Sequence, residues 1–171
     1  MSRRLPTESF ESLITYPEPV SPPNLISAKT AIEYGLIKPN FITGIIDGNT
    51  IQMVVDGEEI EIRLYGIDAP EKKQAYGQQA TMALESLTDG REIWIKIIDT
   101  DEYGRKIAVI FADNDCINQE MIKSGYAWVY PEYCKITSCN KWREYEAQAR
   151  VAERGLWADA AATPPWEYQH E

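Results

Sequence analysis

Histidine is almost absent from this sequence of 171 residues: its single histidine, His170, stands next to the end of the chain. A lone terminal histidine argues against proton transfer by histidine. Cysteine is scarce as well, and the three cysteines form no Cys-x-x-Cys pattern, so we expect no structural zinc site. Cys134 and Cys139 lie five residues apart. They either close a small disulfide loop in an oxidising compartment or remain two free thiols.

Long apolar runs are missing too. No run approaches the roughly 20 apolar residues that a membrane-spanning helix needs, so we expect no membrane association. The basic start, Met1 to Arg4, leads into Leu5, Pro6, Thr7 and Glu8 and not into an apolar stretch, so no signal peptide is visible. Because a leader could have been removed, the location stays open: secreted or periplasmic in that case, and cytoplasmic otherwise.

Positive charge is in deficit, with 17 basic against 27 acidic side chains and a net charge of -10. Residues 1–40 carry four of each sign, so the whole excess lies in residues 41–171. Binding a polyanion normally draws on a basic surface, so this charge argues against tight, non-specific binding to DNA. A carboxylate-rich surface can still contain a locally positive cleft, particularly where some carboxylates hold a cation.

The length fits one domain plus a tail, and a hydrophobic content of 44% supports a folded core. Residues 1–38 hold five of the ten prolines and show no sustained period of 2 or 3.6, which predicts an extended arm. A short helix over about 28–34, capped by Ser27, is possible within that arm. Residues 39–171 form the expected domain.

Strand patterns begin at Phe41 and cover residues 41–46, 50–55 and 58–67. The pairs Asp47-Gly48 and Asp56-Gly57 separate β-branched runs, which predicts hairpin turns and a three-stranded meander. In the third strand the aliphatic and charged residues alternate, so Arg63 points away from the apolar layer.

Further along, helical spacing over about 76–87 is followed by two alternating segments, 93–97 and 107–111. A short helix over about 118–124 and a longer one that ends before Gly155 complete the pattern. Five strands with a helix between the third and fourth match the connectivity of an OB barrel. The predicted fold is therefore α+β: a five-stranded OB-fold β-barrel with three helices, preceded by an extended N-terminal arm.

Five short segments carry a resemblance to a known family. They are Ile-Asp-Gly-Asn-Thr-Ile at 46–51, Arg-Leu-Tyr-Gly-Ile-Asp-Ala-Pro-Glu at 63–71, Tyr-Gly-Arg at 103–105, Glu-Ala-Gln-Ala-Arg at 146–150 and Gly-Leu-Trp at 155–157. In this order the sequence resembles the staphylococcal nuclease (thermonuclease) family over about residues 41–166. Each motif alone is weak, and the ordered set is strong.

The resemblance implies a calcium-dependent phosphodiesterase that cleaves DNA and/or RNA. Position by position, Glu71 matches the general base, and Arg63 and Arg105 match two arginines that grip the phosphate. The implied metal positions are Asp68, Asn49 and Ala69. The chemistry is sound in itself, because guanidinium forks suit the charge of a phosphorane-like transition state and calcium prefers oxygen ligands.

Aromatic residues offer further candidates. The resemblance places tyrosines against the bound nucleotide, and we expect Tyr103, Tyr130 and Tyr133 to bind substrate, the last two by stacking on nucleobases. Trp128 is expected to pack in the core or on the surface and not to bind substrate. The three later tryptophans are expected to pack the C-terminal helix and tail without a chemical role: Trp142, Trp157 and Trp166.

Two positions depart from the family pattern. At Asn49 the family usually has a second calcium-binding aspartate, and an amide offers an oxygen but no charge, so metal affinity should fall. At Glu102 a basic residue commonly helps to hold a terminal phosphate, which an acidic side chain should repel.

Each motif also has an ordinary structural interpretation, as a hairpin turn, a solvated strand residue or an acidic turn. The rival hypothesis for the whole chain is a catalytically impaired module of the same fold that binds single-stranded nucleic acid or a protein partner. A monomer is expected in either case.

Overall fold

The computed structural model describes residues 35–168. The short helix predicted over 28–34 lies outside the described residues. Two adjacent residues before the first long strand pack onto the domain. Leu36 is buried, and Ile37 and Ile95 each donate a backbone hydrogen bond of 2.9 Å to the other. The predicted boundary between arm and domain at residue 38 remains a prediction.

The predicted meander is present as β1 (Phe41–Asp47), β2 (Thr50–Val55) and β3 (Glu58–Leu64), paired antiparallel in sequence order. Asp56 and Gly57 connect β2 to β3 with φ angles of 50° and 82°. Positive φ at both central residues suits the right-handed twist of a hairpin, which is why the sequence has Asp-Gly there.

The third strand is shorter than predicted. It ends at Leu64 and not at Ile67, because Tyr65 and Gly66 form a turn in which Gly66 has a φ of 71°. Beyond the turn, β4 (Ile67–Asp68) pairs antiparallel with β8 (Trp128–Val129) in a separate two-stranded sheet. The turn therefore redirects the chain so that Asp68 leaves the main sheet.

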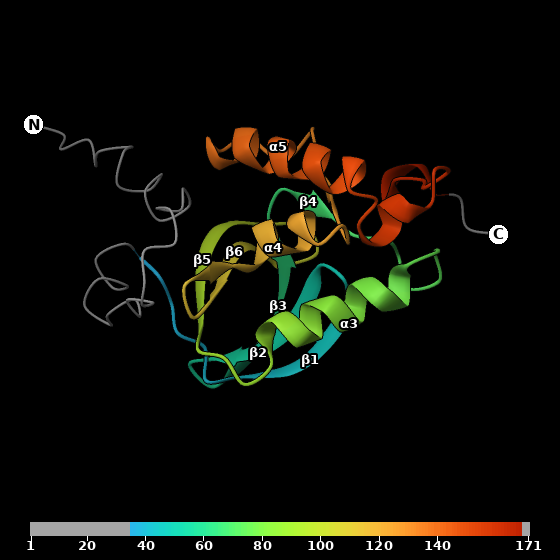
Figure 1. The fold of residues 1–171 in the computed structure, drawn as a ribbon. Coiled ribbons are helices and arrows are strands. Elements are labelled where there is room, and N and C mark those ends of the chain that lie inside the picture. Colours follow the sequence, from blue (N-terminus) through green and yellow to red (C-terminus); the bar gives the residue numbers. More distant parts are fainter. Residues whose placement is uncertain (1–34, 169–171) are drawn as a thin grey trace, which may run out of the picture.

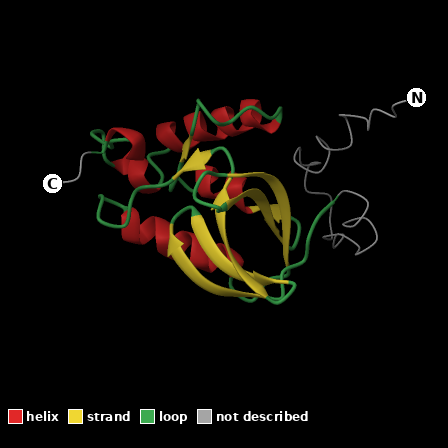
Figure 2. Ribbon diagram, turned by 180° about the vertical axis from the view of Figure 1, so that it is seen from behind, coloured by secondary structure: helices red, strands yellow, loops and turns green. Residues whose placement is uncertain are grey.

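The main sheet continues with β5 (Ile93–Thr100) and β6 (Lys106–Ala112), and the short β7 (Asp115–Cys116) pairs with β6. The strand order is β1-β2-β3-β6-β5, with β3 and β6 parallel. Figure 2 shows this sheet strongly curved. Among residues 35–168 no strand pairing joins β1 to β5, so full closure of the predicted barrel remains a prediction.

Three α-helices cover the sheet, as predicted: α3 (Gly77–Thr88), α4 (Ile117–Lys123) and α5 (Ser138–Val151). Figure 1 shows α4 between the other two helices, with α5 on its far side from α3. Two 3-10 turns, η1 (Gly155–Ala158) and η2 (Pro165–Glu167), follow α5. Within the described part of the chain, no helix is long and apolar enough to cross a membrane.

The core lies between the curved sheet and the helices. It includes the alternate aliphatic residues of the strands, with Ile51, Met53, Ile62, Leu64, Ile95 and Ile110 at most 1% exposed. Trp142 is fully buried, and Trp128 packs edge-on against Trp157 at a centroid distance of 5.0 Å. The packing roles predicted for these three tryptophans are confirmed. Cys134 and Cys139 are joined by a disulfide, and Cys116 is free and buried.

Candidate active site

One pocket brings the predicted site residues together. It has a volume of about 700 Å³ and is lined by residues from the β1–β2 turn, β3, the β4 segment, the β5–β6 turn, the loop after β8 and the C-terminal tail. All nine predicted site residues line it: Asn49, Arg63, Asp68, Ala69, Glu71, Tyr103, Arg105, Tyr130 and Tyr133. Four segments of the sequence, up to 84 positions apart, thus converge on one pocket.

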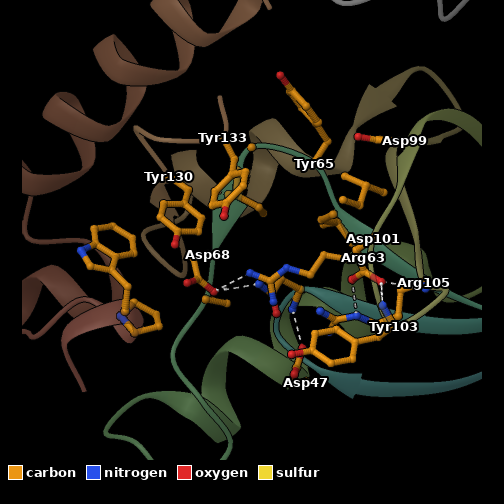
Figure 3. Close-up of a pocket in the computed structure, with 18 of the residues that line it drawn as sticks. Asp47, Arg63, Tyr65, Asp68, Asp99, Asp101, Tyr103, Arg105, Tyr130 and Tyr133 are labelled. Carbon is orange, nitrogen blue, oxygen red and sulfur yellow. Dashed lines mark hydrogen bonds and ion pairs between the residues drawn. The ribbon is translucent and has the colours of Figure 1, made fainter. Parts of the chain in front are cut away.

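Asp68 lies at the centre of the pocket (Figure 3). Its Oδ1 accepts a hydrogen bond from Arg63 Nη2 at 2.9 Å and another from Asn49 Nδ2 at 3.0 Å. Asn49 is itself buried, and its backbone amide donates to Asp47 Oδ1 at 3.0 Å. Asn49 is therefore a turn residue, as its ordinary interpretation holds, and also a direct partner of Asp68.

The electrostatics of Asp68 favour a cation beside it. Burial raises the pKa of the Asp68 carboxyl more than the charge of Arg63 and the hydrogen bonds from Arg63 and Asn49 lower it, and the nearby charge of Asp47 adds to the rise. A carboxylate with a raised pKa is short of compensating positive charge. Any added cation would therefore stabilise its ionised form.

Arg105 is held by the turn that carries it. Asp101 Oδ1 accepts hydrogen bonds from the backbone amides of Tyr103 and Arg105, at 3.0 and 2.9 Å. Asp101 Oδ2 accepts from Arg105 Nε at 2.7 Å. Burial acts to raise the pKa of Asp101, but the hydrogen bonds from Arg105 outweigh it and the pKa is lowered. One aspartate thus shapes the turn and orients the guanidinium.

Glu71 stands at the start of a tightly folded loop. Its backbone amide donates to Gln74 Oε1 at 3.1 Å, and its carbonyl accepts from the Gln74 amide at 2.8 Å. A side chain at Gly77 would collide with the Glu71 carbonyl, so this position has room only for glycine. Gln74 Nε2 also donates to the carbonyl of Thr163 at 2.5 Å, which ties the loop of Glu71 to the C-terminal tail.

The three predicted substrate-binding tyrosines lie on two sides of Asp68. Figure 3 shows Tyr130 and Tyr133 on one side of Asp68 and Tyr103 on the other. Tyr103 is 75% exposed, and the guanidinium of Arg105 lies 5.6 Å from its ring centre. Tyr130 and Tyr133 meet edge to face at 4.7 Å. The disulfide begins directly after Tyr133, so it constrains the loop that presents both rings.

Comparison with known proteins decides the family. The model described as "Staphylococcal nuclease homologue" matches residues 61–159, which is more than half of the chain. The chain belongs to the staphylococcal nuclease family. An uncharacterized endonuclease of Escherichia coli is 37% identical over 130 residues, covering 75% of this chain and 83% of its own length.

Two further relatives fit the same assignment. A micrococcal nuclease of Shigella flexneri is 36% identical over 137 residues, covering 75% of this chain and 78% of its own length. The probable staphylococcal-like nuclease CAN2 of Oryza sativa subsp. japonica is 38% identical over 110 residues, which is 64% of this chain. Those residues span only 29% of the length of the rice protein.

The donor set of this staphylococcal-nuclease-family pocket fits a hard cation. Among residues 35–168, His, Cys, Asp and Glu side chains nowhere gather in threes as a metal site built on such groups would require. The cation would instead take one carboxylate from Asp68, an amide oxygen from Asn49 and the backbone carbonyl of Ala69. These are all oxygens, which calcium prefers, but they carry a single negative charge.

The pocket as a whole is anionic. Six carboxylates line it, from Asp47, Asp68, Glu71, Asp99, Asp101 and Glu102, against three cationic side chains, from Arg63, Lys72 and Arg105. A phosphodiester would enter this pocket against a net repulsion unless positive charge were added. The predicted repulsion of a terminal phosphate by Glu102 is not tested by this arrangement.

Sequence reasoning missed three residues of the pocket region. Asp101 and Gln74 act through hydrogen bonds, and an aspartate four residues before Arg105 in a turn was the available signal for the first. Trp166 packs as expected, edge-on against Trp128 at 6.4 Å, and it also lines the pocket and is 39% exposed. No sequence pattern marks its place in the pocket, and it lies beyond residue 159, where the family match ends.

Proposed function

We propose that this chain is a calcium-dependent nuclease that hydrolyses phosphodiester bonds of DNA and/or RNA. The observation that supports it most is the convergence of Arg63, Arg105, Glu71 and Asp68 on one pocket from separate segments. Membership of a nuclease family adds to this support.

Arg63 and Arg105 are the proposed phosphate-binding groups. Each is paired with an aspartate, Arg63 with Asp68 and Arg105 with Asp101. A guanidinium has five N–H donors, so each arginine can keep its aspartate and still donate to a phosphate oxygen. Negative charge grows on these oxygens in the phosphorane-like transition state, where fixed donors stabilise it most.

Glu71 is the proposed general base. Its carboxylate would take a proton from a water molecule as the water oxygen attacks phosphorus. The bond from phosphorus to the sugar oxygen then breaks, and that oxygen leaves with the electron pair and takes up a proton from solvent water. The contacts with Gln74 and Gly77 fix the backbone from which the carboxylate extends. Such positioning matters because a general base contributes about 10² to 10⁴ in rate only when it is well placed.

Asp68, Asn49 and Ala69 are the proposed cation-binding residues. A bound calcium ion would neutralise charge on a phosphate oxygen and polarise the phosphate. This neutralisation would also reduce the repulsion that the anionic lining exerts on an entering phosphodiester. Because the proposed contacts are to phosphate, broad tolerance of sugar and nucleobase is expected.

A gel assay tests the proposal. The purified chain is incubated with plasmid DNA, a single-stranded oligodeoxynucleotide and an RNA of matched length, each with calcium and with a chelator. Cleavage with calcium that stops with chelator supports a calcium-dependent nuclease. Binding without cleavage of any of the three would instead favour the impaired binding module, for which Asn49 and the acidic charge are the arguments.

A further inference from the structure

We propose that Trp166 is a nucleobase-stacking residue of the substrate site, contributed by the C-terminal tail. The proposal rests on the proposed nuclease function and specifies its substrate class: strands whose nucleobases are unpaired. It concerns a residue outside the matched span 61–159.

The tryptophan is part of an aromatic wall. Its ring is parallel to that of Tyr130, with the ring centres 4.9 Å apart, and Tyr130 meets Tyr133 edge to face at 4.7 Å. Trp166 is 39% and Tyr133 56% exposed, so part of each side chain remains open to water at the pocket, although Tyr130 covers one face of Trp166. Such surface is a site for a flat apolar ligand.

The tail that carries this ring is anchored at several points. Thr163 is bound through its carbonyl to Gln74, and Pro165, which is buried, fixes the backbone directly before the tryptophan. The Tyr168 amide donates to the carbonyls of Pro164 and Pro165, both at 3.1 Å. Because the turn is held on both sides of Trp166, its ring can be presented to a ligand with little loss of entropy.

The chemistry of this wall suits a nucleobase and not a phosphate. Its members, Tyr130, Tyr133, Pro165 and Trp166, carry no positive charge. Figure 3 shows both tyrosines on the opposite side of Asp68 from Arg105. A strand with its phosphate at the arginines would therefore place an adjacent nucleobase toward the aromatic wall. The pocket, at about 700 Å³, has room for more than a phosphate group.

Stacking needs an exposed nucleobase face, which a duplex hides and a single strand offers. The expected contribution of one stacked nucleobase corresponds to about a five- to hundredfold change in affinity. The inference therefore separates two kinds of substrate: linkages flanked by nucleobases, which should benefit from Trp166, and linkages flanked by abasic residues, which should not.

The test uses Trp166→Ala, Trp166→Leu and Trp166→Phe, with Phe41→Ala as the matched control. Phe41 is an exposed aromatic residue on β1, 59% accessible and outside this pocket. Each variant is given a short single-stranded oligodeoxynucleotide and the same strand with abasic residues on both sides of one linkage. Melting curves establish that each variant is folded, and Trp166→Leu keeps apolar packing if Trp166→Ala does not fold.

We expect the Ala and Leu variants to raise KM for the ordinary strand at least fivefold with little change in kcat, and to leave abasic cleavage unchanged. Trp166→Phe keeps an aromatic ring and should raise KM for the ordinary strand much less. An unchanged KM in both variants, or an equal loss on the abasic strand, would overturn the inference while leaving nuclease function intact. If the wild type cleaves neither strand, the proposed nuclease function fails, and binding measured by fluorescence anisotropy decides on Trp166 by the same comparison.

Discussion

Asn49 Nδ2 donates a hydrogen bond to Asp68 Oδ1 over 3.0 Å, at a position where both side chains are buried. The contact joins the β1–β2 turn to the β4 segment and contributes no negative charge to the pocket. The neutral amide of Asn49 stabilises the ionised form of Asp68 by this hydrogen bond. Compared with an aspartate at position 49, it offers a bound metal ion one carboxylate fewer.

Asn49→Asp is predicted to destabilise the metal-free protein and to tighten calcium binding. A second carboxylate beside Asp68 should repel it in the metal-free protein and lower the melting temperature. With calcium, the extra charged ligand should tighten binding by an order of magnitude or more. Calcium titration calorimetry and melting curves with and without calcium measure both effects.

Asp47→Asn is the matched control for that change, because it alters a nearby carboxylate of the same turn that is bonded to the Asn49 amide. It should not tighten calcium binding. If Asn49→Asp neither tightens calcium binding nor lowers the calcium needed for cleavage, position 49 is not a cation ligand.

Calcium binding is predicted to weaken on acidification at a pH above the usual range of aspartate. Burial raises the pKa of Asp68, so a proton competes with the cation at a higher pH than at an ordinary aspartate. In the metal-free protein the same raised pKa means that stability falls as pH rises through it, because ionisation then occurs in a buried site. Calcium affinity measured at a series of pH values checks this, and an affinity that stays constant down to the ordinary aspartate range contradicts it.

Asp101→Ala is predicted to lower kcat about ten- to hundredfold although Asp101 is not a proposed phosphate contact. Its carboxylate holds Arg105 Nε and two backbone amides, so its loss should misplace the guanidinium. Asp101→Asn keeps one acceptor oxygen, which can still bind the two backbone amides, and loses the acceptor for Arg105 Nε, so it should lose less than Asp101→Ala. The control is Asp89→Ala, an exposed aspartate at the end of α3. A wild-type kcat in Asp101→Ala would contradict the prediction that Asp101 positions Arg105.

The disulfide predicts a thiol count and a melting shift. Unreduced, denatured protein should show one reactive thiol, and native protein none, because burial raises the pKa of the Cys116 thiol to about 12. Replacing Cys134 and Cys139 by serine should cost about 2 kcal/mol by loop entropy and raise KM through the tyrosine loop. Three thiols in unreduced protein would contradict the disulfide. An unchanged KM in the double variant would contradict its effect on the tyrosine loop.

Much of the fold followed from local pattern. The Asp-Gly turns and alternating strands placed the meander, and helical spacing placed α5, which ends at Val151, before Gly155 as predicted. The end of β3 was wrong because Tyr65 has a strand-like side chain, while the chain turns at Gly66. The β4–β8 pair was missed, since two-residue strands have no period to detect.

Some residues of the candidate site could likewise be predicted from the sequence, and others could not. Residues within motifs, such as Arg63 and Glu71, could be named from the sequence, and they line one pocket. Gln74 and Trp166 could not be, because their roles come from a hydrogen bond that spans 89 positions and a ring stack that spans 36. Contacts of this range are set by tertiary packing and leave no spacing in the sequence.

The most direct test of the central claim is the single-turnover cleavage rate of an oligonucleotide by Glu71→Gln, Arg63→Ala and Arg105→Ala, with Glu85→Gln on the exposed face of α3 as control. Each site variant should melt like a folded protein and cleave at least tenfold more slowly than wild type at saturating calcium. The control should cleave at the wild-type rate. Wild-type rates in all three site variants would show that this pocket does not cleave nucleic acid.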